Sequence, residues 1–160
     1  MIKTNFLTKL KEEGKLNLVE QSEEICTSYI FKSDNSLKSA KILLENRLYD
    51  DSTSSSYYAM YNILTALLFK TGIKCENHAG SILLLKLLFN KNELFDIVSK
   101  AKEERIDKQY YVTSEDITFT QESATKLVIN AEDFTVKMKV VIQNIKNEEM
   151  IALRENFAKI

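Results

Sequence analysis

The stretch DDSTSSSYYAMYNILTALLFKTG, residues 50–72, decides the fold class of this chain. It begins with Asp50, Asp51 and Ser52, acidic and hydroxyl side chains that suit the free N–H groups of a first helical turn. Apolar side chains then occupy more than one face of the helical repeat, and the stretch ends at Gly72, a typical helix-ending residue. A helix that is apolar on several sides has to be surrounded, so these residues predict the central helix of a bundle.

The glycine and proline content supports a helical fold. The 160 residues include no proline and three glycines. Sandwiches and barrels need many turns, and turns use glycine and proline, whereas long helices need neither. We therefore predict an all-α protein in which strands have almost no place.

Amphipathic periods predict further helices on both sides of the central one. They cover about residues 4–13, 18–46, 79–89, 93–108 and 120–146. The polar triplet Ser33-Asp34-Asn35 is a point where the second of these could kink or split. Residues 110–120 are rich in β-branched and aromatic side chains and are predicted to form an ordered loop. The charged residues 147–160 are predicted to continue the last helix as a frayed tail.

The domain organisation is simple. A chain of 160 residues matches one domain of roughly 100–200 residues, and we find no internal repeat or low-complexity linker. We predict a single domain over residues 1–160. Its architecture is expected to be an antiparallel up-and-down bundle of about five helices with short connections.

Charge and cysteine use limit the function classes. The net charge is 22 − 23 = −1, which argues against broad, nonspecific binding to nucleic acid and leaves room for a small local basic patch. Cys26 and Cys75 have no paired spacing and are predicted to be free thiols in a reducing compartment. Neither a signal peptide nor an apolar run of roughly 18 residues is found, so we expect a cytoplasmic protein without a membrane span.

The aromatic and imidazole side chains around the central helix allow two interpretations. Tyr57, Tyr58 and Tyr61 are first of all expected to pack the core or a dimer interface, and the alternative is a surface on which nucleotide bases stack. His78 is the one histidine of the chain. It can be an ordinary first-turn residue or a binding and proton-transfer group. A single imidazole cannot form a metal cluster, so no metal site is expected.

Arg105 is the main candidate for phosphate recognition, because the planar donors of a guanidinium match phosphate oxygens in pairs. The alternative is an exposed arginine that is compensated by Glu103, Glu104 and Asp107. Tyr110 and Tyr111 follow it. The chain shows no glycine-rich phosphate loop, Ser/His/Asp set or carboxylate pair. The motifs that would indicate a common hydrolase, kinase or dehydrogenase are therefore missing.

Several of these features together resemble HEPN (higher eukaryotes and prokaryotes nucleotide-binding) domains, in particular small stand-alone prokaryotic members. The features are Ser56 to Tyr61, Ala66-Leu67-Leu68, Gly72, the helix-opening His78, the upstream Ala40-x-x-Leu43-Leu44, the downstream Arg105…Tyr110, and the late apolar series Ala124, Leu127, Ala131 and Phe134. The resemblance covers roughly residues 20–146.

This resemblance implies a helical bundle that pairs into a two-fold homodimer. It also implies that the partner is a minimal nucleotidyltransferase, with which many such proteins form a toxin–antitoxin pair. By this resemblance, the active members of the family are endoribonucleases that need neither a metal ion nor a cofactor. Their signature is an arginine followed after about four to six residues by a histidine. Two copies of this motif meet in a cleft between the subunits, where the arginine holds the phosphate and the histidine moves a proton.

The sequence departs from that signature at one position. Arg105 is present, but Tyr110 stands where the histidine is expected, and an unperturbed tyrosine with a pKa of roughly 10 is a poor base near neutral pH. The first hypothesis is therefore a nucleotide- or RNA-binding protein that uses Tyr57, Tyr61, His78, Arg105 and Tyr111. The alternatives are a ribonuclease toxin that combines Arg105 with Tyr110, Tyr111 or His78, and a helical adaptor without a nucleotide role.

Overall fold

A computed structural model describes residues 2–110 and 120–160, with the side chains of residues 5–106 and 120–160. In these residues the chain forms seven helices and one two-stranded sheet, which confirms the all-α prediction. The elements are α1 (Ile2–Glu12), β1 (Leu16–Leu18), α2 (Glu23–Glu45), α3 (Tyr49–Lys70), β2 (Ile73–Cys75), α4 (His78–Leu87), α5 (Asn92–Tyr110), α6 (Gln121–Asn144) and α7 (Asn147–Ala158). Within that part of the chain, no helix has the length and apolar character needed to cross a membrane.

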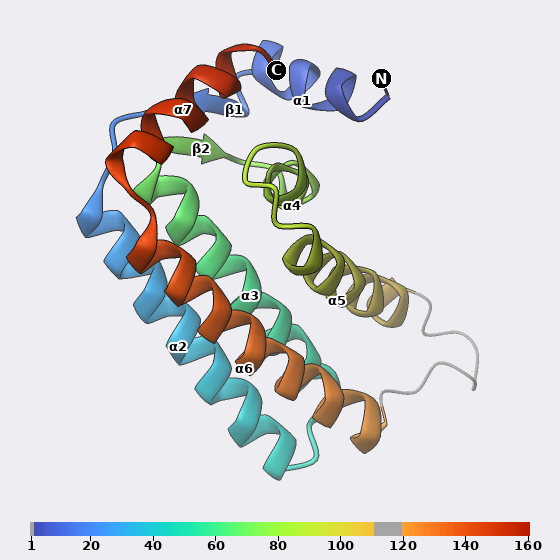
Figure 1. The fold of residues 1–160 in the computed structure, drawn as a ribbon. Coiled ribbons are helices and arrows are strands. Elements are labelled where there is room, and N and C mark those ends of the chain that lie inside the picture. The colour runs from blue at the N-terminus through green and yellow to red at the C-terminus, as the bar shows by residue number, and fades with distance from the viewer. Residues whose placement is uncertain (1, 111–119) are drawn as a thin grey trace.

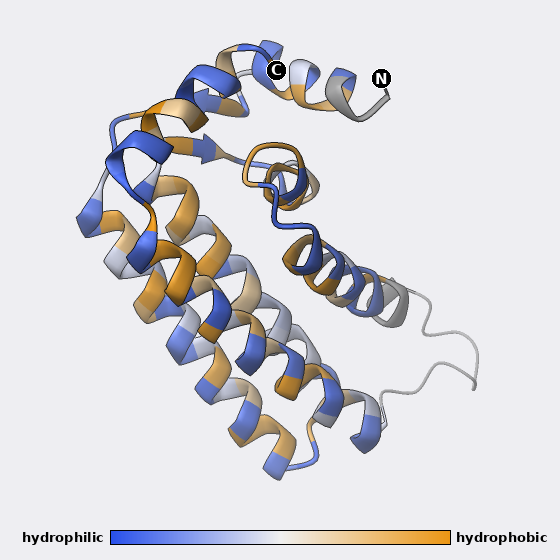
Figure 2. Ribbon diagram, in the orientation of Figure 1, coloured by the Kyte–Doolittle hydropathy of each residue, from blue (hydrophilic) through white to orange (hydrophobic). Residues whose placement is uncertain are grey.

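Helix α3 is the centre of the bundle, as its sequence predicts. Helices α2, α3 and α6 lie side by side along their lengths, with α5 next to them and α4 seen nearly end-on (Figure 1). The C-terminal half of α3 is the more apolar half (Figure 2). The fully buried side chains of α3 include Tyr57, Met60, Ile63, Leu64 and Leu67.

Helix α2 approaches α3 closely through small and hydroxyl side chains. The Ser33 hydroxyl donates a hydrogen bond to the Ala59 carbonyl at 2.7 Å, and the Ser52 hydroxyl donates one to the Ala40 carbonyl at 2.8 Å. All four residues are buried. The polar triplet at 33–35 does not break α2, because Ser33 is satisfied across the interface and Asp34 lies at the surface, where it pairs with a lysine of α6.

The region before α2 corrects the sequence prediction. The helix predicted from residue 18 begins at Glu23, and Leu16–Leu18 instead form a strand that pairs antiparallel with Ile73–Cys75. Gly72 ends α3 with a φ of +73°, a conformation that favours glycine, and it turns the chain into β2. The expectation of almost no strands missed this small sheet because its two strands are far apart in sequence.

The C-terminal residues also differ from the prediction of a frayed continuation. Ile145 is extended (φ −66°, ψ 123°), which ends α6 and lets α7 fold back across the end of the bundle, as Figure 1 shows. Helix α7 buries Met150 and Phe157, seven residues apart on one helix face. Residues 147–158 are thus an ordered helix packed on the sheet end of the domain.

Arg154 fixes α7 to the end of α3. Its Nη1 atom donates to the carbonyls of Val19 at 2.9 Å, Thr71 at 3.3 Å and Gly72 at 2.9 Å. The last carbonyls of a helix lack intrahelical partners and carry partial negative charge, so a guanidinium there is favourable. One side chain therefore links α7, the C-terminus of α3 and the strand region.

The substitution Arg154→Met is expected to lower the free energy of unfolding by about 2 kcal/mol, because it removes a charged donor from three carbonyls. Unfolding in urea measures this value. Arg47→Met is the matched control, since Arg47 is exposed in the turn between α2 and α3. Equal stabilities of the two variants would contradict the assigned role of Arg154.

Candidate functional site

Five side chains from three helices meet on one side of α3. Tyr57, Tyr58 and Tyr61 come from α3, His78 is the first residue of α4, and Arg105 lies in the last part of α5. Ring contacts join the tyrosines to His78, and the guanidinium of Arg105 lies over two of the tyrosine rings. We call these five residues the Arg105–His78 cluster.

The position of His78 follows from the start of α4. Asn77 is the N-cap residue, and its side chain accepts a hydrogen bond from the Gly80 amide at 2.9 Å. The imidazole then stacks on the ring of Tyr61, with centroids 3.7 Å apart and planes 13° apart. Its Nδ1 atom lies 2.7 Å from the Tyr57 hydroxyl oxygen. The histidine is therefore held by a stack and a hydrogen bond from the central helix.

The hydrogen bond between Tyr57 and His78 determines the tautomer of the imidazole. Tyr57 is fully buried, and burial raises the pKa of its hydroxyl, so the phenol keeps its proton. A buried hydroxyl hydrogen needs an acceptor, and within the described residues only Nδ1 of His78 is in reach. Tyr57 thus donates to Nδ1, and the neutral ring carries its own hydrogen on Nε2.

Arg105 lies against the same tyrosines. Its Cζ atom is 4.8 Å from the centroid of the Tyr58 ring and 5.2 Å from that of Tyr57, and Nη2 donates to the Tyr58 hydroxyl at 3.0 Å. The Nε atom is buried and has no partner among the described residues. Neither Glu103 nor Glu104 forms an ion pair with this guanidinium, and the side chain of Asp107, the third residue of the alternative interpretation, lies outside the described residues.

The environment keeps His78 uncharged near neutral pH. Its pKa is lowered first by burial and then by the positive charges of Arg105 and Lys102. A neutral imidazole beside a guanidinium is a set of hydrogen-bond donors with one full positive charge. Such a set suits the oxygens of a phosphate group.

The structure thus brings four of the predicted site residues together, Tyr57, Tyr61, His78 and Arg105. Tyr111 and the side chain of Tyr110 lie outside the described residues. Sequence reasoning did not assign Tyr58 to the site, although its position one residue after Tyr57 placed it next to the same helix face. The described part of the chain contains no group of three or more His, Cys, Asp or Glu side chains that could hold a metal ion.

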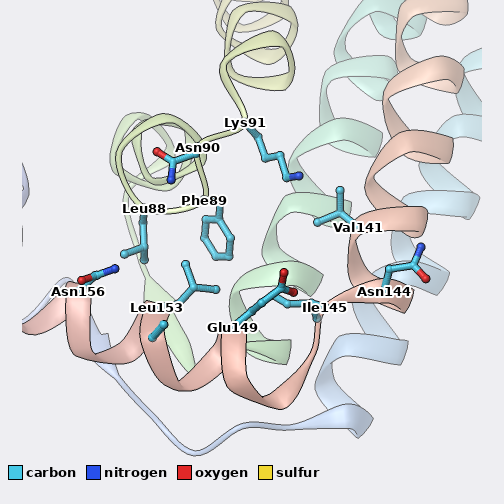
Figure 3. A pocket seen from close by; sticks show the side chains of 11 residues that line it. Leu88, Phe89, Asn90, Lys91, Val141, Asn144, Ile145, Glu149, Leu153 and Asn156 are labelled. Carbon is cyan, nitrogen blue, oxygen red and sulfur yellow. The ribbon is translucent and has the colours of Figure 1, made fainter.

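A cavity of about 370 Å³ lies elsewhere, between the turn after α4, the end of α6 and α7 (Figure 3). Phe89, Val141 and Leu153 give it apolar walls, and Asn90 and Glu149 are among its polar side chains. It shares no residue with the Arg105–His78 cluster.

The fold and the cluster together define an all-helical protein in which a histidine of α4 and an arginine of α5 pack against a tyrosine-rich central helix. The sequence profile of the HEPN domain matches residues 27–141. The chain belongs to the HEPN family, which confirms the resemblance found in the sequence.

Curated relatives agree with this family. A protein of Methanocaldococcus jannaschii named as a candidate toxin is 31% identical over 121 residues, which is 71% of this chain and 85% of that protein. A UPF0332 protein of Gloeobacter violaceus is 38% identical over 53 residues, 33% of this chain and 42% of that protein. A UPF0332 protein of Pyrococcus horikoshii is 40% identical over 57 residues, 36% of this chain and 40% of that protein.

The imidazole of His78 is expected to titrate below its ordinary pKa of 6.5, and Arg105→Gln is expected to raise that pKa. Because the folded state disfavours the protonated ring, the unfolded state binds more protons just below pH 6.5. The contribution of His78 to the free energy of unfolding therefore falls as the pH falls through this range. NMR titration measures the pKa directly, since the chain has one histidine. A pKa above 6.5 in the folded protein would contradict the described environment.

Proposed function

We propose that this chain is a nucleotide- or RNA-binding HEPN protein of a toxin–antitoxin-like module, with a minimal nucleotidyltransferase as its partner protein. The family membership and the toxin name of the Methanocaldococcus relative support the module. The binding site in this proposal is the Arg105–His78 cluster. Its ligand is a phosphate of a nucleotide or of single-stranded RNA.

The observation that carries the proposal is the convergence of Arg105 and His78 on one tyrosine surface. The guanidinium keeps donors that no described carboxylate occupies, and the neutral imidazole carries a hydrogen on Nε2. Charge-assisted hydrogen bonds to phosphate oxygens are among the stronger ones in proteins. Because the net charge of the chain is −1, its surface as a whole does not attract nucleic acid, and a local cationic site of this kind gives selective rather than general binding.

The tyrosines have different roles in this proposal. Tyr57 is fully buried, so it acts by orienting His78 and not by stacking on a base. Tyr61 stacks on one face of the imidazole and has a hydroxyl 3.5 Å from that of Ser81. Tyr58, 39% exposed, holds the guanidinium and offers the accessible aromatic edge. The cluster is thus a phosphate site on an aromatic support.

A second candidate is a metal-independent endoribonuclease, because a histidine does lie beside Arg105 although position 110 is tyrosine. As a general base, His78 needs a ring nitrogen that is free to accept the 2′-hydroxyl proton. Tyr57 occupies Nδ1 and thereby leaves the hydrogen on Nε2. This arrangement favours binding over cleavage, and we rank the two functions in that order.

The variant Arg105→Gln is expected to bind single-stranded RNA about 10- to 100-fold more weakly than the unchanged protein, because charged hydrogen bonds to the phosphate are lost. Fluorescence anisotropy with a labelled oligoribonucleotide measures the affinity. Arg47→Gln removes the same charge at an exposed turn and is expected to stay within about twofold.

The same RNA, analysed for length after incubation without metal, separates the candidate functions. Intact RNA with Arg105-dependent affinity supports the binding protein. Cleavage that requires both Arg105 and His78 contradicts it and supports the ribonuclease. Absence of both binding and cleavage contradicts both functions and supports the adaptor.

The protein is also proposed to form a homodimer. Ile129, Val136 and Val140 of α6 are 59%, 58% and 51% exposed, and their spacing places them on one helix face. An apolar face of this kind on a soluble domain suits contact with another copy.

In solution the mass is expected to be twice the 18.5 kDa of the chain, as measured by light scattering. Val136→Glu is expected to shift the protein to the monomer mass, because a charge would be buried in the contact. Leu87→Glu, at an exposed apolar position at the end of α4, is expected to leave the dimer intact. A monomeric unchanged protein would contradict the dimer.

A further inference from the structure

The accessible face of α3 continues from the Arg105–His78 cluster toward the C-terminal end of that helix. It carries Tyr58, Tyr61, Asn62, Thr65 and Phe69, which follow one another at helical spacing. Each of these side chains is partly or well exposed, unlike the side chains of α3 that face the core. We call these five residues the α3 strip. Its first two members belong to the cluster, so the strip begins inside the site already described.

Helix α2 borders the other part of the α3 strip, since α2 and α3 lie side by side (Figure 1). The Asn62 side chain donates to the Ser36 hydroxyl at 3.3 Å. The ring of Tyr29 stacks on that of Phe69, with centroids 5.7 Å apart and planes 9° apart. The strip therefore lies between α2 on one side and the cluster residues of α4 and α5 on the other.

Lys32 of α2 is a second cation beside the strip. Its Nζ atom lies 4.9 Å from the centroid of the Tyr29 ring, the ring that also stacks on Phe69. Lys32 is exposed, and in the described part of the chain no carboxylate forms an ion pair with it. Asp34, two residues along, pairs instead with Lys139 of α6. The two aromatic rings therefore position an ammonium group whose charge is left for a ligand.

Both ends of the strip thus have a cation on a tyrosine ring, Arg105 over Tyr58 and Lys32 over Tyr29. Tyr58 and Phe69 are 11 positions apart, which corresponds to about 16 Å at the helical rise of 1.5 Å per residue. A stacked nucleic-acid strand has one phosphate for about every 3.4 Å, and an extended strand advances further, so this length corresponds to about three to five phosphates.

Between the two cations the strip is polar and uncharged. Asn62 uses one amide hydrogen for Ser36, which leaves its other amide hydrogen and its oxygen for a ligand. The Thr65 hydroxyl donates to the Tyr61 carbonyl at 2.9 Å, so its oxygen remains an acceptor. Side chains of these types contact the sugars and phosphates of nucleic acids. None of the five strip residues is a carboxylate that would repel a phosphate.

We propose that the α3 strip binds the backbone of single-stranded RNA, with one phosphate on Arg105 and His78 and a later phosphate of the same strand on Lys32. This inference rests on the proposed function and narrows its ligand to a strand of about four or more nucleotides, because a single nucleotide reaches the cluster alone. The rings of Tyr29 and Tyr58 position the cations. Contacts to the backbone carry no base information, so the strip binds strands of different sequence alike.

The test compares two labelled oligoribonucleotides, diuridylate and hexauridylate, by fluorescence anisotropy. Diuridylate is too short to join the two ends of the strip. Lys32→Gln is expected to weaken the binding of hexauridylate about three- to fivefold, as for one exposed ion pair, and to change that of diuridylate by less than about twofold. For hexauridylate it is also expected to reduce the slope of log affinity against log salt by about 0.7, the value for one phosphate contact of a single strand.

Lys38→Gln is the matched control. Lys38 is also exposed on α2, but six residues further along it lies on a different face of the helix. This variant is expected to bind both oligonucleotides within about twofold of the unchanged protein. Lys32→Arg keeps the positive charge and the contact with the Tyr29 ring, so it is expected to retain the affinity for hexauridylate.

The outcomes separate the strip from the proposed function. If Lys32→Gln binds hexauridylate as Lys38→Gln does, while Arg105→Gln binds it more weakly, the strip is overturned and the phosphate site remains. Equal weakening of both oligonucleotides by Lys32→Gln also overturns the strip, because Lys32 would then act at the cluster. A changed mass of Lys32→Gln in solution overturns it as well and assigns this face to a contact between copies. If the unchanged protein binds neither oligonucleotide, the proposed function fails, and the strip fails with it.

Discussion

The need to bury helix α3 on nearly every side organises this protein. Its apolar side chains leave few positions open to water, so other helices must cover it. Helix α2 comes close because serine and alanine stand at the contact, and the buried serines donate to carbonyls of the facing helix. Helices α4, α5 and α6 cover the remaining sides. A polar group on α3 must then find its partner inside this packing or at its edge.

Tyr57 is where that constraint produces a candidate site. Its ring belongs to the core, but its hydroxyl needs an acceptor, and His78 at the start of α4 provides one. The same hydrogen bond sets the tautomer of the imidazole. The tyrosines next to Tyr57 then support the imidazole and the guanidinium of Arg105. The side chains that pack the core around Tyr57 are therefore the same ones that form the proposed phosphate site.

Local patterns in the sequence predict most of the helices, because helical periodicity is a property of neighbouring residues. They do not predict the pairing of Leu16–Leu18 with Ile73–Cys75, which joins two short segments across α2 and α3. The sequence predicts a frayed tail in place of helix α7, because the two apolar residues that this helix buries, Met150 and Phe157, stand among many charged ones. In the site, the residue types were predictable. The meeting of His78 with Arg105 was not, because it depends on how α4 and α5 pack against α3.

The arginine and the histidine of this site come from different helices. A search for an arginine followed at short distance by a histidine would therefore pass over this chain, although both side chains contact the same tyrosines. Family members without the linear signature can be screened by another rule: a tyrosine-rich central helix, a histidine opening the next helix and an arginine late in the one after it. Under that rule, the loss of the histidine from the linear motif does not by itself mean that a family member lacks a histidine packed against the same tyrosines as its arginine.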